Sequence, residues 1–421
     1  MIEQIAVRRY KCLSRVDLRL LPFQVLIGPN ASGKSTFLDT IAFLSELLRE
    51  GAERAVLNRA NSLNELVWKR EREELQFAVE LRLPEVLQAR VQKNGEGYTH
   101  CRYEVSIGVD PQQGGIRPLG ENFFLVRKAD RPSQVVQRSL FPKEPLLPDT
   151  ILLGKHRHTP RGWKRVVSLT EEGKAYLRSE TTEWNFPLRP GPQKAALALV
   201  PEEEERFPIS NWARRVLTEG VQVIALNSRA MRQPCSPVAP RAFQPDGSNL
   251  PLVLRELQNK IRPKYQDWLH HVQTVLPDLA ELETIERPED RHLYLLATYN
   301  SGVKAPSWLI SDGTLRLLAL TLLAYLPLEG SIYLIEEPEN GIHPLAVEAV
   351  FQSLSSVYTG QVLLATHSPL ILGLAKPEQI LCFAQTASGA TDIVSGKDHP
   401  ALRDWRGQIN LGILYASGVL G

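Results

Sequence analysis

The stretch Gly28-Pro-Asn-Ala-Ser-Gly-Lys-Ser-Thr36 decides how this chain folds, because it follows the spacing G-x-x-x-x-G-K-[ST]. In this pattern the glycines let the backbone fold around a phosphate group, so that its N–H groups point inward. Lys34 would neutralise the charge of the β- and γ-phosphates, and the Ser35 hydroxyl can ligate Mg²⁺. The spacing therefore predicts a site for the phosphates of a nucleotide.

The residues around this loop strengthen the prediction. The apolar run Phe23 to Ile27 predicts a strand before the loop, and residues 34–50 repeat apolar side chains with the period of a helix. The positive end of that helix dipole would also favour phosphate. We predict that all residues of the loop bind nucleotide: Gly28, Pro29, Asn30, Ala31, Ser32, Gly33, Lys34, Ser35 and Thr36.

A second apolar run, Ile332 to Ile335, ends in two acidic residues, Glu336 and Glu337. Adjacent side chains point to opposite faces of a strand, so the two carboxylates can take different roles. One would hold Mg²⁺, directly or through water, and the other would polarise an attacking water molecule. Acids at the end of a strand are usually just solvated, so this pair is informative only together with the phosphate loop.

Two further features lie near these strands. The segment Leu309-Ile-Ser-Asp-Gly-Thr-Leu-Arg316 opens a helix for which Ser311 or Asp312 is a natural N-cap. The alternative is a second helix start that binds phosphate. His367 follows the apolar strand Gln361 to Leu364, and ligands bind at the carboxyl ends of parallel strands. It could hydrogen-bond the γ-phosphate or the attacking water, although an isolated histidine is more often structural.

The pattern of elements divides the chain into three parts. Residues 1–83 carry the phosphate loop, and residues 289–421 alternate uninterrupted apolar strands with helices, which favours an α/β fold with a parallel sheet covered on both faces. Residues 84–288 are rich in proline and glycine and lack sustained heptads, so we predict a compact insertion, partly β and partly helical. We expect strands over residues 2–10, 15–20, 103–109, 122–126, 361–366 and 379–384, and helices over residues 193–200, 210–217, 250–260, 313–326 and 344–357.

The composition is that of an ordinary globular protein, with 43% hydrophobic and 23% charged residues among 421. The formal net charge of +2 neither requires nor excludes nucleic acid, so a binding surface would have to be local. The four cysteines, Cys12, Cys101, Cys235 and Cys382, are far apart, which favours a reducing cytoplasm over a disulfide framework. No signal-peptide core or bilayer-spanning run is present, so we expect a cytoplasmic protein without membrane contact.

Taken together and in this order, the motifs resemble the head of an ABC-type ATPase of the RecF/SMC/OLD-like group, the defence-associated AAA family. Three stretches carry the closer resemblance: Arg9-Tyr-Lys-Cys12, Glu336-Glu-Pro-Glu-Asn-Gly-Ile-His-Pro344 and Ala365-Thr-His-Ser-Pro369. It covers residues 1–50 and 290–385. The resemblance implies a P-loop fold with a mixed sheet flanked by helices, a large α+β insertion, and ATP and Mg²⁺ as ligands.

The resemblance also assigns roles to the candidate residues. The phosphate loop is like Walker A, and Glu336 and Glu337 are like the Mg²⁺-binding and catalytic acids of Walker B. His367 resembles the switch histidine, and Lys11 matches a basic residue that lies by the nucleotide. The signature motif, which contacts ATP on a partner head and so implies a head-to-head dimer, would be Ser311, Asp312, Gly313 and Thr314.

Some positions depart from the family pattern. Glu336 stands where many members have aspartate, so it could hold Mg²⁺ through water. Asp312 replaces a signature glycine, which would weaken closure driven by ATP. The Q-loop glutamine is not placed by the sequence, and Gln76 and Gln233 are the candidates.

We therefore predict an ATPase that dimerises through its heads and acts as a switch in DNA repair or anti-phage defence, with a separate effector or nuclease chain. The alternatives are a slow or non-hydrolysing scaffold that cages a toxin and, less favoured, the nucleotide-binding subunit of a transporter. DNA is a possible partner, but a solvated basic face explains the same two basic stretches equally well. These stretches surround Trp163 and comprise Arg127, Lys128, Arg131, Lys155, His156, Arg157, His158, Arg161, Lys164 and Arg165.

Overall fold

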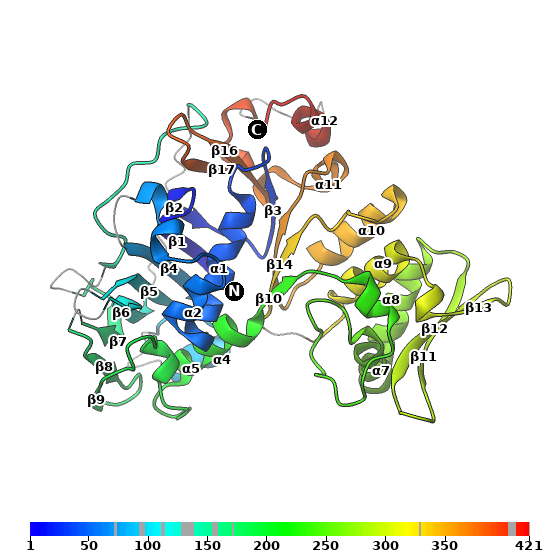
Figure 1. The fold of residues 1–421 in the computed structure, drawn as a ribbon, viewed down its shortest axis with the longest axis horizontal. Helices are drawn as coiled ribbons and strands as arrows, with labels where there is room; N and C mark the ends of the chain where they lie inside the picture. Colours follow the sequence, from blue (N-terminus) through cyan, green and yellow to red (C-terminus); the bar gives the residue numbers. More distant parts are fainter. Residues whose placement is uncertain are drawn as a thin grey trace.

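The described part of the protein forms three sheets with helices packed on them. The structure, a computed structural model, describes residues 1–70, 74–91, 97–110, 114–127, 139–153, 159–170, 172–327, 330–402 and 410–420. Within these ranges the sheets have eight, six and three strands (Figure 1). None of the helices described is long and apolar enough to cross a membrane.

The six-stranded sheet carries the phosphate loop. In spatial order its strands are β10 (Val221–Ile224), β14 (Ile332–Glu336), β15 (Gln361–Ala365), β3 (Phe23–Ile27), β16 (Ile380–Gln385) and β17 (Thr391–Ser395). The first five are parallel, and β17 is antiparallel to β16. The strands predicted in this region are confirmed, and β3, which leads into the loop, lies inside the sheet.

Both faces of this sheet are covered, one by helices and the other by α1 and a second sheet. Successive side chains of a strand point to opposite faces, so neighbouring residues of β3 enter different cores. Leu26 of β3 joins a core with α1 (Lys34–Glu50) and the eight-stranded sheet. Val25, its neighbour, joins a second core on the opposite face. The larger helices of this second core are α7 (Leu250–Lys260), α8 (Arg262–Gln273), α9 (Asp312–Leu322), α10 (Pro344–Ser355) and α11 (Pro369–Leu374). The predicted α/β class, with a mixed sheet flanked by helices, is confirmed.

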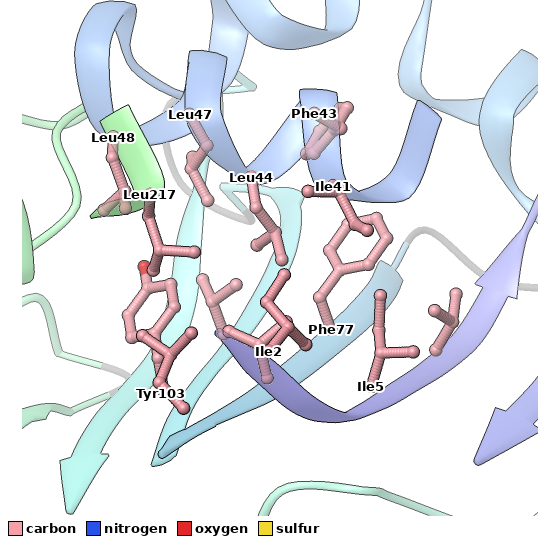
Figure 2. Packing of buried hydrophobic residues seen from close by; sticks show 14 of the residues in the cluster. Ile2, Ile5, Ile41, Phe43, Leu44, Leu47, Leu48, Phe77, Tyr103 and Leu217 are labelled. Carbon is pink, nitrogen blue, oxygen red and sulfur yellow. The ribbon is translucent and has the colours of Figure 1, made fainter. Parts of the chain in front are cut away.

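The eight-stranded sheet is antiparallel throughout. Its strands, in spatial order, are β2 (Leu13–Arg19), β1 (Ile2–Tyr10), β4 (Glu74–Arg82), β5 (His100–Val109), β6 (Ile116–Val126), β7 (Trp163–Leu169), β8 (Ala175–Arg178) and β9 (Asn185–Leu188). Figure 2 shows Ile41, Leu44 and Leu47 of α1 facing Ile2 of β1 and Phe77 of β4. The helix that starts at the phosphate loop is therefore held between the two large sheets.

The remaining elements complete the two sides of the molecule. A lobe beside α9 and α10 contains α7, α8 and the antiparallel strands β11 (Leu279–Glu286), β12 (Leu293–Tyr299) and β13 (Lys304–Pro306) (Figure 1). Trp268 of α8 is fully buried there and donates to the Thr321 hydroxyl of α9 at 3.0 Å. The other helices are α2 (Ala52–Leu57), α3 (Leu63–Leu66), α4 (Glu85–Arg90), α5 (Pro208–Arg215), α6 (Ser228–Arg232) and α12 (Leu411–Ala416).

One predicted helix is wrong. Residues 193–200 contain only a single 3₁₀ turn, Leu197–Leu199. The buried Glu121 carboxylate of β6 accepts hydrogen bonds from two backbone N–H groups at the start of this turn, at 2.5 and 2.8 Å. Pro201 follows, and a proline disfavours helical angles at the residue before it. These two constraints fix the segment against the sheet instead of letting a helix extend.

Three other predicted helices have different bounds, and the one predicted over residues 344–357 ends at Ser355. The one predicted over residues 210–217 is α5, which begins at Pro208 and passes into a π-helical turn, Val216–Gly220. The one predicted over residues 313–326 ends at Leu322. The eight-stranded sheet also takes strands from both sides of the predicted boundary between residues 83 and 84. The domain limits 1–83, 84–288 and 289–421 stay a prediction.

A buried carboxylate, Glu180, holds the start of α5. Its oxygens accept hydrogen bonds from the backbone N–H groups of Ile209 and Ser210, both at 2.7 Å, and from the Ser210 hydroxyl at 2.5 Å. Burial away from water raises the pKa of Glu180 from 4.5 to about 7, although these hydrogen bonds favour the charged form.

We expect Glu180 to make the protein less stable as the pH rises from 4.5 to about 7. In this window the unfolded carboxyl is ionised while the folded one keeps its proton, so unfolding releases a proton and is favoured by rising pH. Glu180→Gln removes this titration, and its free energy of unfolding should change less across the window. Urea unfolding at both ends of the window measures the effect, with the exposed Glu205→Gln as control. The same pH dependence in wild type and Glu180→Gln would contradict the assignment.

Candidate nucleotide-binding site

The phosphate loop joins the end of β3 to the start of α1, and two of its glycines have backbone angles that side chains disfavour. Gly28 has φ 147°, and a Cβ there would overlap the carbonyl oxygen of Phe383 in β16. Gly33 has φ 103°, and a Cβ there would overlap the hydroxyl of Thr391 in β17. The neighbouring strands therefore leave room only for glycine at both positions.

Lys34 lies in the first turn of α1 with its ammonium group among backbone carbonyls. Its Nζ donates to the carbonyl oxygens of Gly28 at 2.7 Å and Pro29 at 2.9 Å. Burial lowers the pKa of Lys34, while the nearby Glu336 and Glu337 carboxylates act in the opposite direction. The N-cap makes no side-chain hydrogen bond to the first turn of this helix. A phosphate could therefore receive both the lysine and the N–H groups of the helix start.

The first acid of the pair faces the loop directly. The Ser35 hydroxyl donates to Glu336 Oε2 at 2.6 Å, although the two residues are 301 positions apart in the chain. The contact exists because β14, β15 and β3 are adjacent parallel strands that end at the same edge of the sheet. A hydroxyl and a carboxylate oxygen are hard oxygen ligands of the kind that Mg²⁺ prefers. These two residues fit a magnesium site.

The second acid, Glu337, is held in a different direction. Its φ of 46° is in the left-handed region, which is strained for a residue with a side chain. Its N–H donates to the carbonyl oxygen of Ala365 at 2.8 Å, and its carboxylate accepts a hydrogen bond from the Asn340 amide. The Glu337 carboxylate thus has a different partner, Asn340, from that of Glu336, which accepts from Ser35.

His367 follows β15 and lies beside both the loop and the acids. Its Nδ1 is 3.2 Å from the hydroxyl oxygen of Tyr415 in α12. The preceding Thr366 hydroxyl donates to the Glu339 carboxylate at 2.5 Å, which ties the histidine segment to the loop after β14. The sequence assigned no role to Glu339 or Asn340, although both stand in the stretch Glu336 to Pro344 that carries the family resemblance, and it did not indicate Tyr415, which lies outside every motif.

Residues of the phosphate loop, the two acids Glu336 and Glu337, and His367 line one cavity of about 210 Å³. It combines a lysine and a helix N-terminus, a pair of magnesium ligands, a second carboxylate and a histidine. Positioning and charge stabilisation of this kind are what phosphoryl transfer requires from a protein. The residues that line it are Asn30, Ala31, Ser32, Gly33, Lys34, Ser35, Thr36, Glu336, Glu337, Ala365 and His367.

Comparison with family profiles agrees with this geometry. Residues 23–87 and 164–373, more than half of the chain, match the family described as "AAA domain, putative AbiEii toxin, Type IV TA system". The chain belongs to this AAA family. This match confirms the AAA-family part of the predicted resemblance. A search of curated proteins found no significant match.

Among solved structures, the AAA-family chain is similar to SMC head domains. An SMC head bound to the C-winged helix domain of ScpA has a TM-score of 0.49 and 14% identity, covering 94% of this chain and 97% of that one. A head with an extended coiled coil, bound to the C-terminal domain of ScpA and derived from Pyrococcus furiosus, has a TM-score of 0.44 and 13% identity, covering 94% and 96%. The SMC head domain from Thermotoga maritima has a TM-score of 0.43 and 11% identity, covering 94% and 98%.

Two predicted nucleotide contacts of this AAA-family chain, Lys11 and the signature segment, do not line the described cavity, and for the signature the prediction was a contact with ATP on a partner head. Lys11 pairs with Asp39 of α1 at 2.6 Å, and neither Lys11 nor Ser311–Thr314 is among the described residues that line the cavity. Ser311 caps α9, because its hydroxyl oxygen accepts from the Thr314 N–H at 3.1 Å, and Asp312 pairs with Arg232 at 2.7 Å. The start of α9 is thus exposed at Ser311 and Asp312 and lies outside the described cavity of its own chain.

The signature segment contacts the loop that follows the acids. A Cβ on Gly313 would lie 2.6 Å from the carbonyl oxygen of Gly341, so the backbones of the two segments approach closely only because Gly313 has no side chain. This loop, residues 338–343, also contains Asn340, the partner of Glu337. The start of α9 is thus in direct contact with the segment that holds the second acid.

The remaining candidates have other environments. Gln76 is buried in the eight-stranded sheet, where its side-chain oxygen accepts from the N–H of Ile151 at 2.9 Å, and neither Gln76 nor Gln233 lines the cavity as far as the structure is described. Lys164 and Arg165 of the basic stretches line a separate cavity of about 510 Å³. Contact with DNA stays a prediction. The basic residues outside the described ranges are Lys128, Arg131, Lys155, His156, Arg157 and His158.

We expect Glu336→Gln to weaken the binding of a non-hydrolysable ATP analogue about 10- to 100-fold in Mg²⁺, because a magnesium ligand is lost. Without the metal, in the presence of a chelator, the same variant should bind the analogue about as well as wild type does. Isothermal titration calorimetry measures both, with Glu348→Gln on the exposed face of α10 as control. An equal loss with and without Mg²⁺ would show that Glu336 does not act through the metal.

Proposed function

We propose that this chain binds ATP with Mg²⁺ in the cavity at the end of β3 and hydrolyses it. The observation that supports this most is the hydrogen bond from Ser35 to Glu336, because it joins the two motifs at a single set of strand ends. Mg²⁺ held there would neutralise charge on the β- and γ-phosphates. Lys34 would bind the same phosphates in place of its present carbonyl partners.

The catalytic roles fall to Glu337 and His367, which line the cavity together with the metal ligands. Glu337 would accept a hydrogen bond from the attacking water and orient it toward the γ-phosphorus. Its left-handed backbone and its contact with Asn340 support this role, because they hold the carboxylate in one place. His367 would complete the site from the end of β15.

We propose that the working unit is a head-to-head dimer with two ATP molecules between the heads. The position of Ser311–Thr314, outside the described cavity of their own chain and exposed at Ser311 and Asp312, supports an action in trans. The exposed apolar side chain of Leu309, with 69% of its surface accessible, lies beside this motif and would be covered by a partner head.

We further propose that the dimer acts as a switch in defence or DNA repair, in concert with a separate effector or nuclease chain in the cytoplasm. The description of the family, which names a toxin of a Type IV toxin–antitoxin system, supports the defence role. Closure on ATP and reopening after hydrolysis would give such a switch its two states.

We expect wild type to hydrolyse ATP, Lys34→Ala to lose nearly all turnover, and Glu337→Gln to bind ATP and remain as a stable dimer. The first substitution removes the phosphate ligand, and the second removes the group that orients water while preserving the shape of the site. Steady-state phosphate release and size-resolved mass measure these outcomes, with the exposed Lys264→Ala and Glu348→Gln as controls. Turnover by Glu337→Gln at the rate of wild type would disprove its catalytic role.

Mixing two inactive variants tests the action in trans. Lys34→Ala has an intact signature and Ser311→Arg has an intact phosphate loop, so a mixed dimer contains one complete site. If the sites work separately, an equal mixture should recover about a quarter of wild-type turnover, since half the dimers are mixed and each has one of two sites intact. For sites that work separately, no recovery in a mixture shown to exchange subunits would place the signature residues in the site of their own chain.

A further inference from the structure

A tyrosine outside every motif connects the switch histidine to the phosphate loop. The hydroxyl of Tyr415 donates to the carbonyl oxygen of Gly28 at 3.1 Å. The hydroxyl oxygen of Tyr415 also lies 3.2 Å from Nδ1 of His367. Gly28 is the first residue of the phosphate loop, and its carbonyl oxygen also accepts from Lys34 at 2.7 Å. One side chain thus touches both the loop and the residue that faces it across the cavity.

The helix that carries Tyr415 is packed firmly on the histidine segment. α12 lies beside α11, which begins two residues after His367 (Figure 1). A Cβ on Gly412 would overlap the carbonyl oxygen of Pro369, so the first turn of α12 lies directly on the start of α11. Leu411 and Leu420 are buried in the same core, which anchors both ends of the segment.

The Tyr415 hydroxyl has a single proton and two neighbours that could accept it, the Gly28 carbonyl oxygen and Nδ1 of His367. The carbonyl oxygen can only accept a hydrogen bond. With the proton given to Gly28, the hydroxyl oxygen can only accept from His367, which requires a proton on Nδ1. Burial raises the pKa of Tyr415 above its ordinary value, so this hydroxyl keeps its proton in the physiological range. Neutral His367 is left with an unprotonated Nε2.

We propose that Tyr415 is a positioning residue that fixes His367 as its Nδ1–H tautomer and leaves Nε2 as a hydrogen-bond acceptor for the attacking water. This inference rests on the proposed hydrolysis of ATP. His367 has two possible partners, the γ-phosphate and the attacking water. An Nε2 without a proton cannot donate to a phosphate oxygen, so this tautomer favours the water. The C-terminal helix is thereby a part of the hydrolytic site.

The charged surroundings of the histidine are consistent with this arrangement. Lys34 on α1 lines the same cavity, as do the Glu336 and Glu337 carboxylates after β14. Glu339, in the same loop, is engaged by the Thr366 hydroxyl. Tyr415 is the group on α12 that bonds the ring, so its hydroxyl can be removed without altering a charge in the cavity.

Tyr415→Phe removes only the hydroxyl and keeps the ring that packs in α12. Nitrogen-15 NMR of the histidine side chains reports the tautomer, and the spectrum of His367→Gln identifies the His367 signals among the nine histidines. We expect Nδ1–H in wild type and a shift to Nε2–H in Tyr415→Phe. The matched control is Tyr358→Phe, at a position with 86% of the side chain accessible, which should leave the His367 signals unchanged.

Steady-state kinetics of Tyr415→Phe distinguish a residue that positions His367 from one that binds ATP. Tyr415→Phe should lower kcat about tenfold or more, as wrong tautomers and lost outer partners do, while KM for ATP changes little. An Nε2–H tautomer in wild type, or the same tautomer in wild type and Tyr415→Phe, would overturn the inference. If wild type shows no ATP turnover, the proposed hydrolysis fails, and the NMR result alone then decides whether Tyr415 sets the tautomer. Matching thermal unfolding of both tyrosine variants would show that they fold alike.

Discussion

The hydrogen bond between Ser35 and Glu336 depends on a single constraint, the parallel pairing of β3, β15 and β14. Parallel strands end at one edge, so three loops from distant parts of the chain must meet there. The phosphate loop follows β3, the acidic pair comprises the last residue of β14 and the residue after it, and His367 is the second residue after β15. Every group assigned to chemistry on this face owes its place to that register.

The register is in turn protected by the two cores on either side of the sheet. Side chains of β3 alternate between them, so a slip of one residue would send Leu26 and its neighbours into the wrong core. α1 is fixed at its start by the loop and along its length by the eight-stranded sheet, as Figure 2 shows for Leu44 and Leu47. The phosphate loop therefore lies between parts that cannot move independently of it.

Much of this arrangement can be read from the sequence, because its signals are local. Apolar runs followed by a loop motif, by two acids or by a histidine place β3, β14 and β15 and their terminal residues correctly. The false helix at residues 193–200 had an adequate local pattern, but the Glu121 carboxylate, about 75 residues earlier, decides its structure. Tertiary contacts of this kind leave no trace in a local window.

The same distinction explains what was missed at the site. Tyr415 and Asn340 act through hydrogen bonds to backbone or to one partner, and no spacing rule marks a residue that does so. The signature segment was identified by its resemblance to the family motif, which also implies that it contacts ATP on a partner head, and it does not line the described cavity of its own chain. A single sequence shows which residues have reactive side chains. The fold decides which of them come together in one site.

The close approach of Gly313 to Gly341 has a consequence for a paired molecule. In each chain the backbone of the signature touches the loop whose Asn340 holds Glu337. In a dimer, a signature drawn toward the partner's ATP would press on the loop that holds its own chain's general base. Binding of ATP at one site would then change the geometry of the other site. Hydrolysis of the two ATP molecules would be coupled.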